Sequence, residues 1–185
     1  HTKAINPTSE YHFCNEVLRN SFYDSSKWDF EKKRIHSIFM SQANSQRQGL
    51  HQVLKAISIV KDFYPDVNLR VAGLDISGGR KWVHRIGTYG HYIRYMLNTL
   101  KLADRVEFLG GLNEERMAEE FRNAHIFLCA SIIENSPNSL GEAQIIGTPC
   151  IASFVGGVPD MVNDRETGML YRFEEFTMLA FKIME

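Results

Sequence analysis

Six short apolar runs, separated by longer segments with helical spacing, constrain the fold of this chain more than any other feature. The runs occupy residues 35–40, 68–73, 105–110, 125–130, 149–154 and 168–173. Between the first two, residues 49–64 carry apolar side chains three and four positions apart, which places them on one face of a helix. The alternation predicts an α/β fold, with a mainly parallel sheet and helices on both faces.

Three further helices are predicted, at residues 92–102, 115–124 and 138–147. The last one ends at Gly147 with Pro149 following, which is a common stop signal. In a parallel sheet, ligands bind outside the carboxyl ends of the strands. Functional residues are therefore expected in the loops after the strands, beginning at Met40, Gly73, Gly110, Ala130 and Phe154.

The length of 185 residues and a hydrophobic content of 44% suit one well-buried domain. We assign residues 34–185 to this domain and residues 1–33 to a leading helix or interdomain arm. Within that arm, residues 10–23 have helical spacing and 24–34 form a polar connector. Because the first residue is not Met and the last ones stop inside an amphipathic pattern, we expect a fragment of a longer protein.

The glycine-rich, basic stretch 73–92 is predicted to be a long, mobile loop. It includes a near-match to a phosphate-binding loop, in which Gly79 stands where that motif needs its lysine. The near-match is therefore interpreted as chance.

Composition excludes several classes of function. The formal net charge of -1 gives no general attraction to nucleic acid or anionic membranes. No apolar run approaches the roughly 20 residues that span a bilayer. Three cysteines share no paired spacing, and two of them, Cys129 and Cys150, lie in apolar runs and are predicted to be buried. A reducing, cytoplasmic location fits this pattern.

Familiar catalytic motifs are also missing from the sequence. There is no G-x-G-x-x-G after the first strand, no H-E-x-x-H and no G-x-S-x-G. The sequence therefore does not support a dinucleotide-dependent enzyme, a zinc hydrolase or an esterase-type nucleophile. No metal site and no cofactor are expected.

One stretch, residues 132–150, carries a pattern with chemical meaning. Ser136 followed by Pro137 is typical of a helix N-cap and first helical residue. The next backbone N–H groups, of Asn138, Ser139 and Leu140, would then be exposed at the positive end of the helix. Such an end is a ready binding site for phosphate.

Two glutamates flank this helix start. Glu134 lies just outside it, and Glu142 lies about 7 Å further along the helix axis, at about 1.5 Å per residue. Carboxylates accept hydrogen bonds from neighbouring hydroxyls, so the stretch suits a ligand that joins a diphosphate to sugars. Spacing alone fits equally well with a polar loop residue and an ordinary acid on a helix surface.

The segment from Glu134 to Glu142 resembles the E-x7-E motif of retaining glycosyltransferases of glycosyltransferase family 4, which have the GT-B fold. The similarity continues through "GTPCIASFVGGVPDMV" and "RETGMLY", and it includes the preceding unit "RVEFLGGLNEERMAEEFRNAHIFLCAS". It covers about residues 35–185. The resemblance implies a Rossmann-like domain, the C-terminal, donor-binding half of such an enzyme.

The resemblance also implies roles for individual residues. Glu142 would bind the ribose of a nucleoside diphosphate sugar, and Glu134 would lie beside the donor sugar as the catalytic carboxylate. The amides of residues 138–140 would hold the diphosphate. Gly111 and Leu112, after the third apolar run, would meet the base.

The sequence departs from the family pattern in the loop after the first strand. Relatives carry an arginine and a lysine there that grip the diphosphate, but this chain has Gln42 and Gln48. Arg47, one position earlier than the lysine, either replaces it or faces solvent. Gly156 and Gly157 likewise have two interpretations: a structural turn, or a loop beside the donor cleft.

The resemblance implies transfer of a hexose from a nucleoside diphosphate sugar to a glycan or lipid-linked acceptor. The acceptor half would belong to the missing domain, so the fragment alone should bind donor without turnover. The whole enzyme would be cytoplasmic, with peripheral association at the inner face of a membrane allowed. Two alternatives remain: an epimerase or phosphorylase of the same architecture, and a non-catalytic sugar-nucleotide-binding module.

Overall fold

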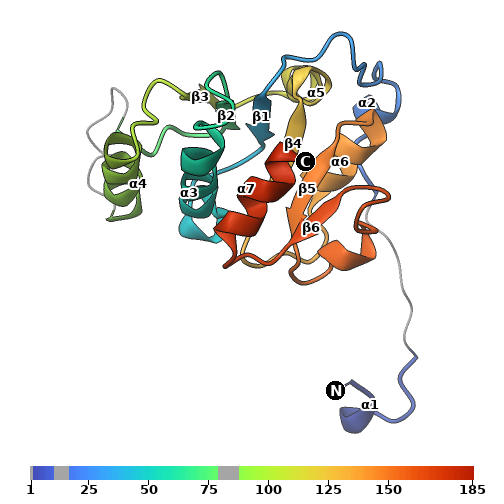
Figure 1. The fold of residues 1–185 in the computed structure, drawn as a ribbon. Coiled ribbons are helices and arrows are strands. Elements are labelled where there is room, and N and C mark those ends of the chain that lie inside the picture. The colour runs from blue at the N-terminus through green and yellow to red at the C-terminus, as the bar shows by residue number, and fades with distance from the viewer. Residues whose placement is uncertain (1, 11–16, 79–87) are drawn as a thin grey trace.

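A six-stranded, fully parallel sheet forms the centre of the protein (Figure 1). The computed structural model describes residues 2–10, 17–78 and 88–185. Within them the strand order is β3-β2-β1-β4-β5-β6. The strands are β1 (Ser37–Met40), β2 (Asn68–Ala72), β3 (Val106–Gly110), β4 (Ile126–Cys129), β5 (Cys150–Ser153) and β6 (Met169–Tyr171). Each predicted apolar run contains one strand, so the predicted α/β fold is confirmed.

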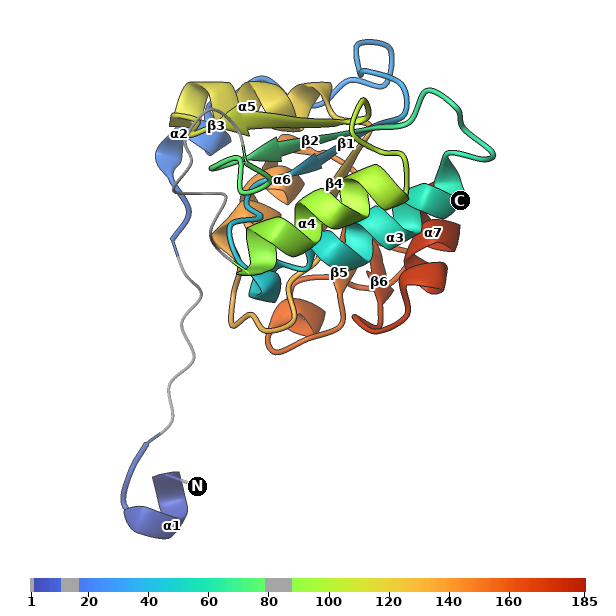
Figure 2. The same ribbon diagram turned by 90° about the vertical axis from the view of Figure 1, so that its left-hand side faces the viewer.

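Helices cover both faces of this sheet (Figures 1 and 2). One face carries α3 (Leu50–Val60), α4 (Thr88–Thr99) and α7 (Phe176–Met184), and the other carries α2 (Asn20–Tyr23), α5 (Glu114–Asn123) and α6 (Asn138–Ile146). The remaining helical elements are α1 (Thr2–Ile5), η1 (Gln46–Gln48) and η3 (Val158–Asp160).

Successive side chains of each strand point into opposite cores. Ile38 and Met40 pack with α3, whereas Phe39 between them packs with α5 and α6. The rings of Phe39, Phe121 and Phe127 meet edge-on or tilted, with centroids 5.0 to 6.0 Å apart. Each fully buried ring contributes roughly 1.5–3 kcal/mol through removal of apolar surface from water. The central strands β1, β4 and β5 are therefore mostly apolar, because both of their faces are buried.

The leading segment was interpreted as a leading helix or an interdomain arm, with helical spacing over residues 10–23. Residues 11–16 lie outside the described part; among the rest, Asn20–Tyr23 form α2, and Arg19 before it has an extended backbone. Phe22 of α2 is fully buried, 6.0 Å from the ring of Phe121. Burial of Phe22 therefore holds α2 against α5.

The connector over residues 24–34 is bound to the domain as well. Trp28 donates its backbone N–H to the carbonyl of Ile146 at 2.8 Å and its indole N–H to the carbonyl of Ala124 at 2.7 Å. These bonds satisfy the carbonyl groups at the ends of α6 and α5. The predicted loop over 73–92 is shorter than expected, since α4 begins at Thr88; its residues 79–87 lie outside the described part.

Both described cysteines are buried and free, as predicted. Burial, with the nearby negative charge of Glu134, raises the pKa of the Cys129 thiol to about 12. Burial raises the pKa of Cys150 as well. Cys129 and Cys150 are therefore packed as small apolar residues and stay protonated near neutral pH.

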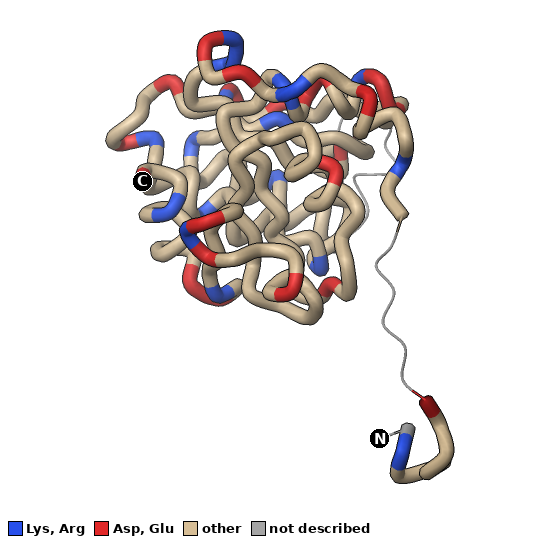
Figure 3. Tube along the Cα trace, turned by 90° about the vertical axis from the view of Figure 1, so that its right-hand side faces the viewer, with Lys and Arg blue, Asp and Glu red and all other residues tan. Residues whose placement is uncertain are grey.

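Positive and negative residues are interspersed along the chain (Figure 3), and one cluster joins three segments of the fold. The carboxylate of Glu120 on α5 accepts from Arg70 of β2 at 2.8 and 2.9 Å and from Arg34 at 3.0 Å. Burial alone would raise the pKa of Glu120, but the hydrogen bonds and charges of the two arginines outweigh it and lower that pKa. The cluster therefore stabilises the folded state through the charged carboxylate.

We predict that Glu120→Gln lowers the free energy of unfolding by about 2 kcal/mol near neutral pH, because charge-assisted hydrogen bonds are lost. The pKa of Glu120 is lowered from its ordinary 4.5, so the pairs stabilise fully above that pH and weaken as pH falls below it. The difference between wild type and variant should shrink accordingly in urea titrations between about pH 7 and pH 3. Glu119→Gln, an exposed site on the same helix, is the control and should change stability by less than about 0.5 kcal/mol.

Candidate functional site

A polar cleft of about 390 Å³ opens at the carboxyl ends of β1 and β4. Its walls come from the loop after β1, the loop after β4, the first turns of α6, and one residue of the leading segment, Arg19. A larger cavity of about 800 Å³ lies at the opposite, amino edge of the sheet and contains none of the predicted site residues. The smaller cleft is therefore the candidate site, since it contains Glu134, Asn138, Ser139 and Glu142.

The start of α6 is shifted by one residue from the prediction. Pro137, rather than Ser136, is the N-cap, and the helix begins at Asn138. The carbonyl of Pro137 accepts from the N–H of Leu140 at 2.9 Å and from that of Gly141 at 3.3 Å, and these bonds set the first turn. The expected N-cap at Ser136 is therefore wrong, since the ring of Pro137 fixes φ without placing the residue inside the helix.

The three predicted phosphate-binding amides are thus not equivalent. Asn138 and Ser139 line the cleft at the first turn, where helix N–H groups have no intrahelical partner. Leu140 is a fully buried core residue, and its N–H is already paired with Pro137. The positive end of α6 faces the cleft through the first two residues.

Glu142 is buried and ion-paired, with a relative side-chain exposure of only 3%. Its partner is Arg19, which donates Nε–H to Oε1 at 2.7 Å and Nη2–H to Oε2 at 2.8 Å. A buried carboxylate needs such a partner, because an unpaired charge away from water is costly. Arg19 was not predicted: it lies 123 positions from Glu142 in a segment outside the motif.

Glu134 is half-buried in the loop after β4, where two glycines hold its backbone. Gly157 donates its N–H to the carbonyl of Glu134 at 3.3 Å. A Cβ atom on Gly156, which has a φ of +50°, would meet the same carbonyl oxygen at 1.7 Å, and one on Gly157 would meet Asn135 O at 1.8 Å. Glycine is therefore required here for a close backbone approach, and neither Gly156 nor Gly157 lines the cleft.

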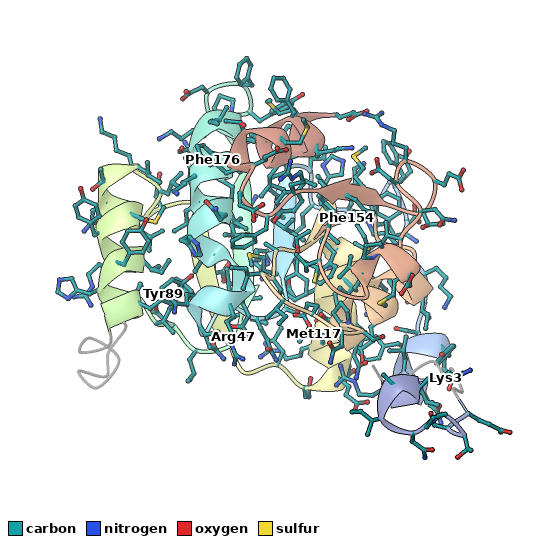
Figure 4. The ribbon with its side chains drawn as sticks, turned by 90° about the horizontal axis from the view of Figure 1, so that it is seen from below. Lys3, Arg47, Tyr89, Met117, Phe154 and Phe176 are labelled. Carbon is teal, nitrogen blue, oxygen red and sulfur yellow. The ribbon has the colours of Figure 1, made fainter. Side chains whose placement is uncertain are left out.

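The loop after β1 presents neutral side chains to the cleft. Gln48 donates from Nε2 to Oε1 of Gln42 at 2.8 Å and accepts from the backbone N–H of Ser45 at 2.9 Å. Arg47 is exposed beside the first turn of α3 (Figure 4) and is not among the residues that line the cleft. Its predicted contact with a diphosphate stays a prediction.

Gly111 and Leu112 lie after β3, and neither lines the cleft. Gly111 is exposed, and Leu112 is half-buried against the core that α5 and α6 share. The cleft is instead lined on this side by Met117 of α5 (Figure 4), a residue that sequence reasoning missed. No pattern singled it out, because Met117 is one apolar position among several on an amphipathic helix.

Among the described residues, no group of three or more His, Cys, Asp or Glu side chains is placed to hold a metal ion. No helix in the same part of the chain is long and apolar enough to cross a bilayer.

The arrangement of a parallel sheet, a helix N-terminus and two carboxylates at one cleft agrees with the family comparison. The sequence profile of a family described as "Glycosyl transferases group 1" matches residues 23–185. This chain belongs to that family. The resemblance stated for the E-x7-E segment is thereby confirmed.

Two bacterial glycosyltransferases are similar to this chain over parts of their length. D-inositol 3-phosphate glycosyltransferase of Corynebacterium glutamicum (strain R) is 35% identical over 124 residues, which are 66% of this chain and 28% of that protein. The enzyme of the same name from Mycobacteroides abscessus is 44% identical over 71 residues, 38% of this chain and 16% of that protein. This chain therefore aligns with less than a third of either relative.

Three solved structures share the fold. A glycosyltransferase from Rickettsia africae superposes with a TM-score of 0.72 at 20% identity, over 90% of this chain and 44% of that one. Sucrose-phosphate synthase from Thermosynechococcus elongatus superposes with a TM-score of 0.68 at 26% identity, over 80% of this chain and 35% of that one. Anabaena Alr3699/HepE, solved in complex with UDP, superposes with a TM-score of 0.67 at 22% identity, over 80% of this chain and 38% of that one.

We predict that Gly157→Ala destabilises the protein by about 2 kcal/mol, because its Cβ would overlap the carbonyl oxygen of Asn135 and displace the loop that carries Glu134. Gly157 has an ordinary φ of −90°, so the effect would report the close approach and not backbone strain. Gly111→Ala is the matched control, since a Cβ there meets nothing within 4 Å. Equal thermal stability of the two variants would contradict the prediction.

Proposed function

We propose that this chain is the donor-binding domain of a retaining glycosyltransferase that transfers a hexose from a nucleoside diphosphate sugar. The acceptor would be a hydroxyl of a glycan or of a lipid-linked saccharide, bound by a further domain. One observation carries the proposal. The first turn of α6 and the carboxylates of Glu134 and Glu142 all face a single cleft at the carboxyl edge of the sheet.

The cleft offers a suitable group for each part of a nucleoside diphosphate sugar. The amides of Asn138 and Ser139 suit the diphosphate, since a helix N-terminus favours anions. Glu142 suits the ribose, whose two hydroxyls can donate to one carboxylate. Glu134, at the mouth, would orient the donor sugar near the reacting bond.

The ligands of similar structures support this choice. Alr3699/HepE has been solved with UDP, with UDP and glucose, and with UDP-glucose. A nucleotide sugar is therefore the class of ligand proposed for this cleft.

The chemistry assigned to this chain is electrostatic. As the glycosidic bond to the diphosphate breaks, negative charge develops on the departing phosphate oxygens. Donors already aimed at those oxygens stabilise that charge without reorganisation. We propose no metal ion and no cofactor for the step, and we place the enzyme in the cytoplasm with peripheral access to a membrane-bound acceptor.

A second candidate is a sugar-nucleotide-binding module without catalytic activity. The hydrogen-bonded pair of Gln42 and Gln48 favours it, because these neutral side chains stand where the family pattern has cations. An epimerase or phosphorylase of the same architecture would be distinguished by its products, in reactions that need no sugar acceptor.

We predict that UDP, GDP or ADP, or one of their sugars, raises the unfolding temperature of the protein by several degrees. Ligand at about 100 times its dissociation constant adds about 2.7 kcal/mol of stability. Glu142→Gln should weaken binding of the nucleoside diphosphate itself, because the ribose contact is lost. Glu134→Gln should abolish the preference for the nucleotide sugar over the bare diphosphate.

Glu174→Gln, an exposed site outside the cleft, is the control for these variants and should bind as wild type does. Calorimetric titration of each variant gives the dissociation constants. Binding by Glu142→Gln that matches wild type would remove the ribose assignment, and the absence of any nucleotide effect on wild type would remove the proposed function. Sugar transfer by the full-length enzyme that survives Glu134→Gln would remove the catalytic assignment.

A further inference from the structure

Arg19 is the one basic side chain among the described residues that line the cleft. Each of the other polar side chains on the wall is neutral or, at Glu134 and Glu142, acidic. A nucleoside diphosphate brings at least two negative charges into this space. With Gln42 and Gln48 neutral, Arg19 is the remaining group on the described wall that can offset them.

The backbone around Arg19 is anchored to the domain. Phe22 of α2 is fully buried against Phe121, and Ser25 accepts from Arg122 of α5 at 2.6 Å. The side chain of Arg19 is 44% exposed, and its guanidinium lies 4.6 Å from the centroid of the Phe22 ring. Because the backbone is anchored and the side chain is half-exposed, the guanidinium of Arg19 can change its partner while the backbone of the segment stays in place.

The present partner of Arg19 is the group proposed to hold the ribose. Both oxygens of Glu142 are engaged by the guanidinium fork, and Glu114 lies 3.6 Å from its Nη1. Glu142 stands four residues beyond Asn138, about 6 Å along the axis of α6. Rotation about the side-chain bonds of Arg19 can cover such a distance and bring the guanidinium to the first turn of the helix.

We propose that Arg19 is the diphosphate-binding cation of this cleft and that donor binding exchanges its partner. The ribose hydroxyls take the place of the guanidinium on Glu142, and the guanidinium forks onto the diphosphate beside the amides of Asn138 and Ser139. One charge-assisted bidentate pair replaces another, so the buried carboxylate keeps its hydrogen bonds throughout. The inference rests on the proposed function and adds to it a cation from the leading segment.

The test compares nucleoside with nucleoside diphosphate. Dissociation constants of UDP, GDP and ADP, and of uridine, guanosine and adenosine, are measured for wild type, Arg19→Ala and Arg19→Lys. For the nucleoside diphosphate that binds wild type, we expect Arg19→Ala to raise the dissociation constant about tenfold or more. The matching nucleoside should bind Arg19→Ala as well as or better than wild type, since Glu142 is freed. Arg19→Lys, which keeps the charge but not the fork, should lie between the two.

Two control variants separate the cation from its surroundings. Arg122→Ala removes an arginine that holds the same segment through Ser25 but does not line the cleft, and it should leave the diphosphate affinity unchanged. Arg47→Ala tests the cation expected from the sequence. If Arg47→Ala loses tenfold in affinity for the nucleoside diphosphate and Arg19→Ala loses none, the inference is overturned. Equal losses of this affinity in Arg122→Ala and Arg19→Ala would overturn it as well.

The remaining outcomes are also decisive. Tighter binding of both nucleoside and diphosphate by Arg19→Ala would mean that Arg19 only blocks the cleft, and the inference would fail while the proposed function stands. Should Arg19→Ala unfold, Arg19→Lys provides the test. The inference then requires that Arg19→Lys weakens binding of the nucleoside diphosphate more than binding of the matching nucleoside, and it fails if both dissociation constants change equally. If no nucleoside diphosphate binds wild type or any variant, the proposed function fails and this inference fails with it.

Discussion

The reversal of strand order at the centre of the sheet is the constraint on which the candidate site depends. From β1 the chain proceeds through β2 to β3 on one side, and it returns to place β4 on the other side of β1. The helix after β1, α3, covers one face, whereas the helix after β4, α6, covers the other. The loops that leave the carboxyl ends of these two strands therefore diverge and open a cleft between them.

Close backbone contacts keep that cleft in shape. Ile132, after β4, donates its N–H to the carbonyl of Arg47 at 2.7 Å, which ties the two diverging loops together. Gly49, with a φ of +76°, lets the start of α3 approach the carbonyl of Ala130, where a Cβ atom would come within 1.9 Å. Gly156 and Gly157 do the same for the loop of Glu134. Glycine is required at these positions because no other residue leaves room for a neighbouring carbonyl.

Electrostatics then links the leading segment to the cleft. Glu142 is buried by the packing of α6, and a buried carboxylate must be paired. The pairing holds Arg19 on the wall of the cleft, while Phe22 and Trp28 anchor the chain to the core that α5 and α6 share. The same ion pair therefore stabilises the domain and places a cation where an anionic ligand is proposed to enter.

The strands and most helices were predictable because their signals are local. Parallel strands buried on both faces are mostly apolar, and amphipathic helices repeat their apolar residues with the helical period. The end of α6 at Gly147 was likewise readable, since its φ of +92° suits glycine. Its start was predicted one residue too early, because Ser136 and Pro137 are both common at helix starts and only the hydrogen bonds of the first turn distinguish them.

Sequence spacing was also sufficient to recognise Glu134, Asn138, Ser139 and Glu142 as one motif, because they lie within nine residues of chain. It could not find Arg19 or Met117, nor could it pair Gln42 with Gln48 as neighbours across the cleft wall. In the described part of residues 10–23, only Asn20–Tyr23 are helical, and Phe22 of this short helix is buried in the domain. Local periodicity and motif spacing act over one or two turns, whereas the partner of a buried charge 123 residues away depends on which surfaces the folded sheet brings together.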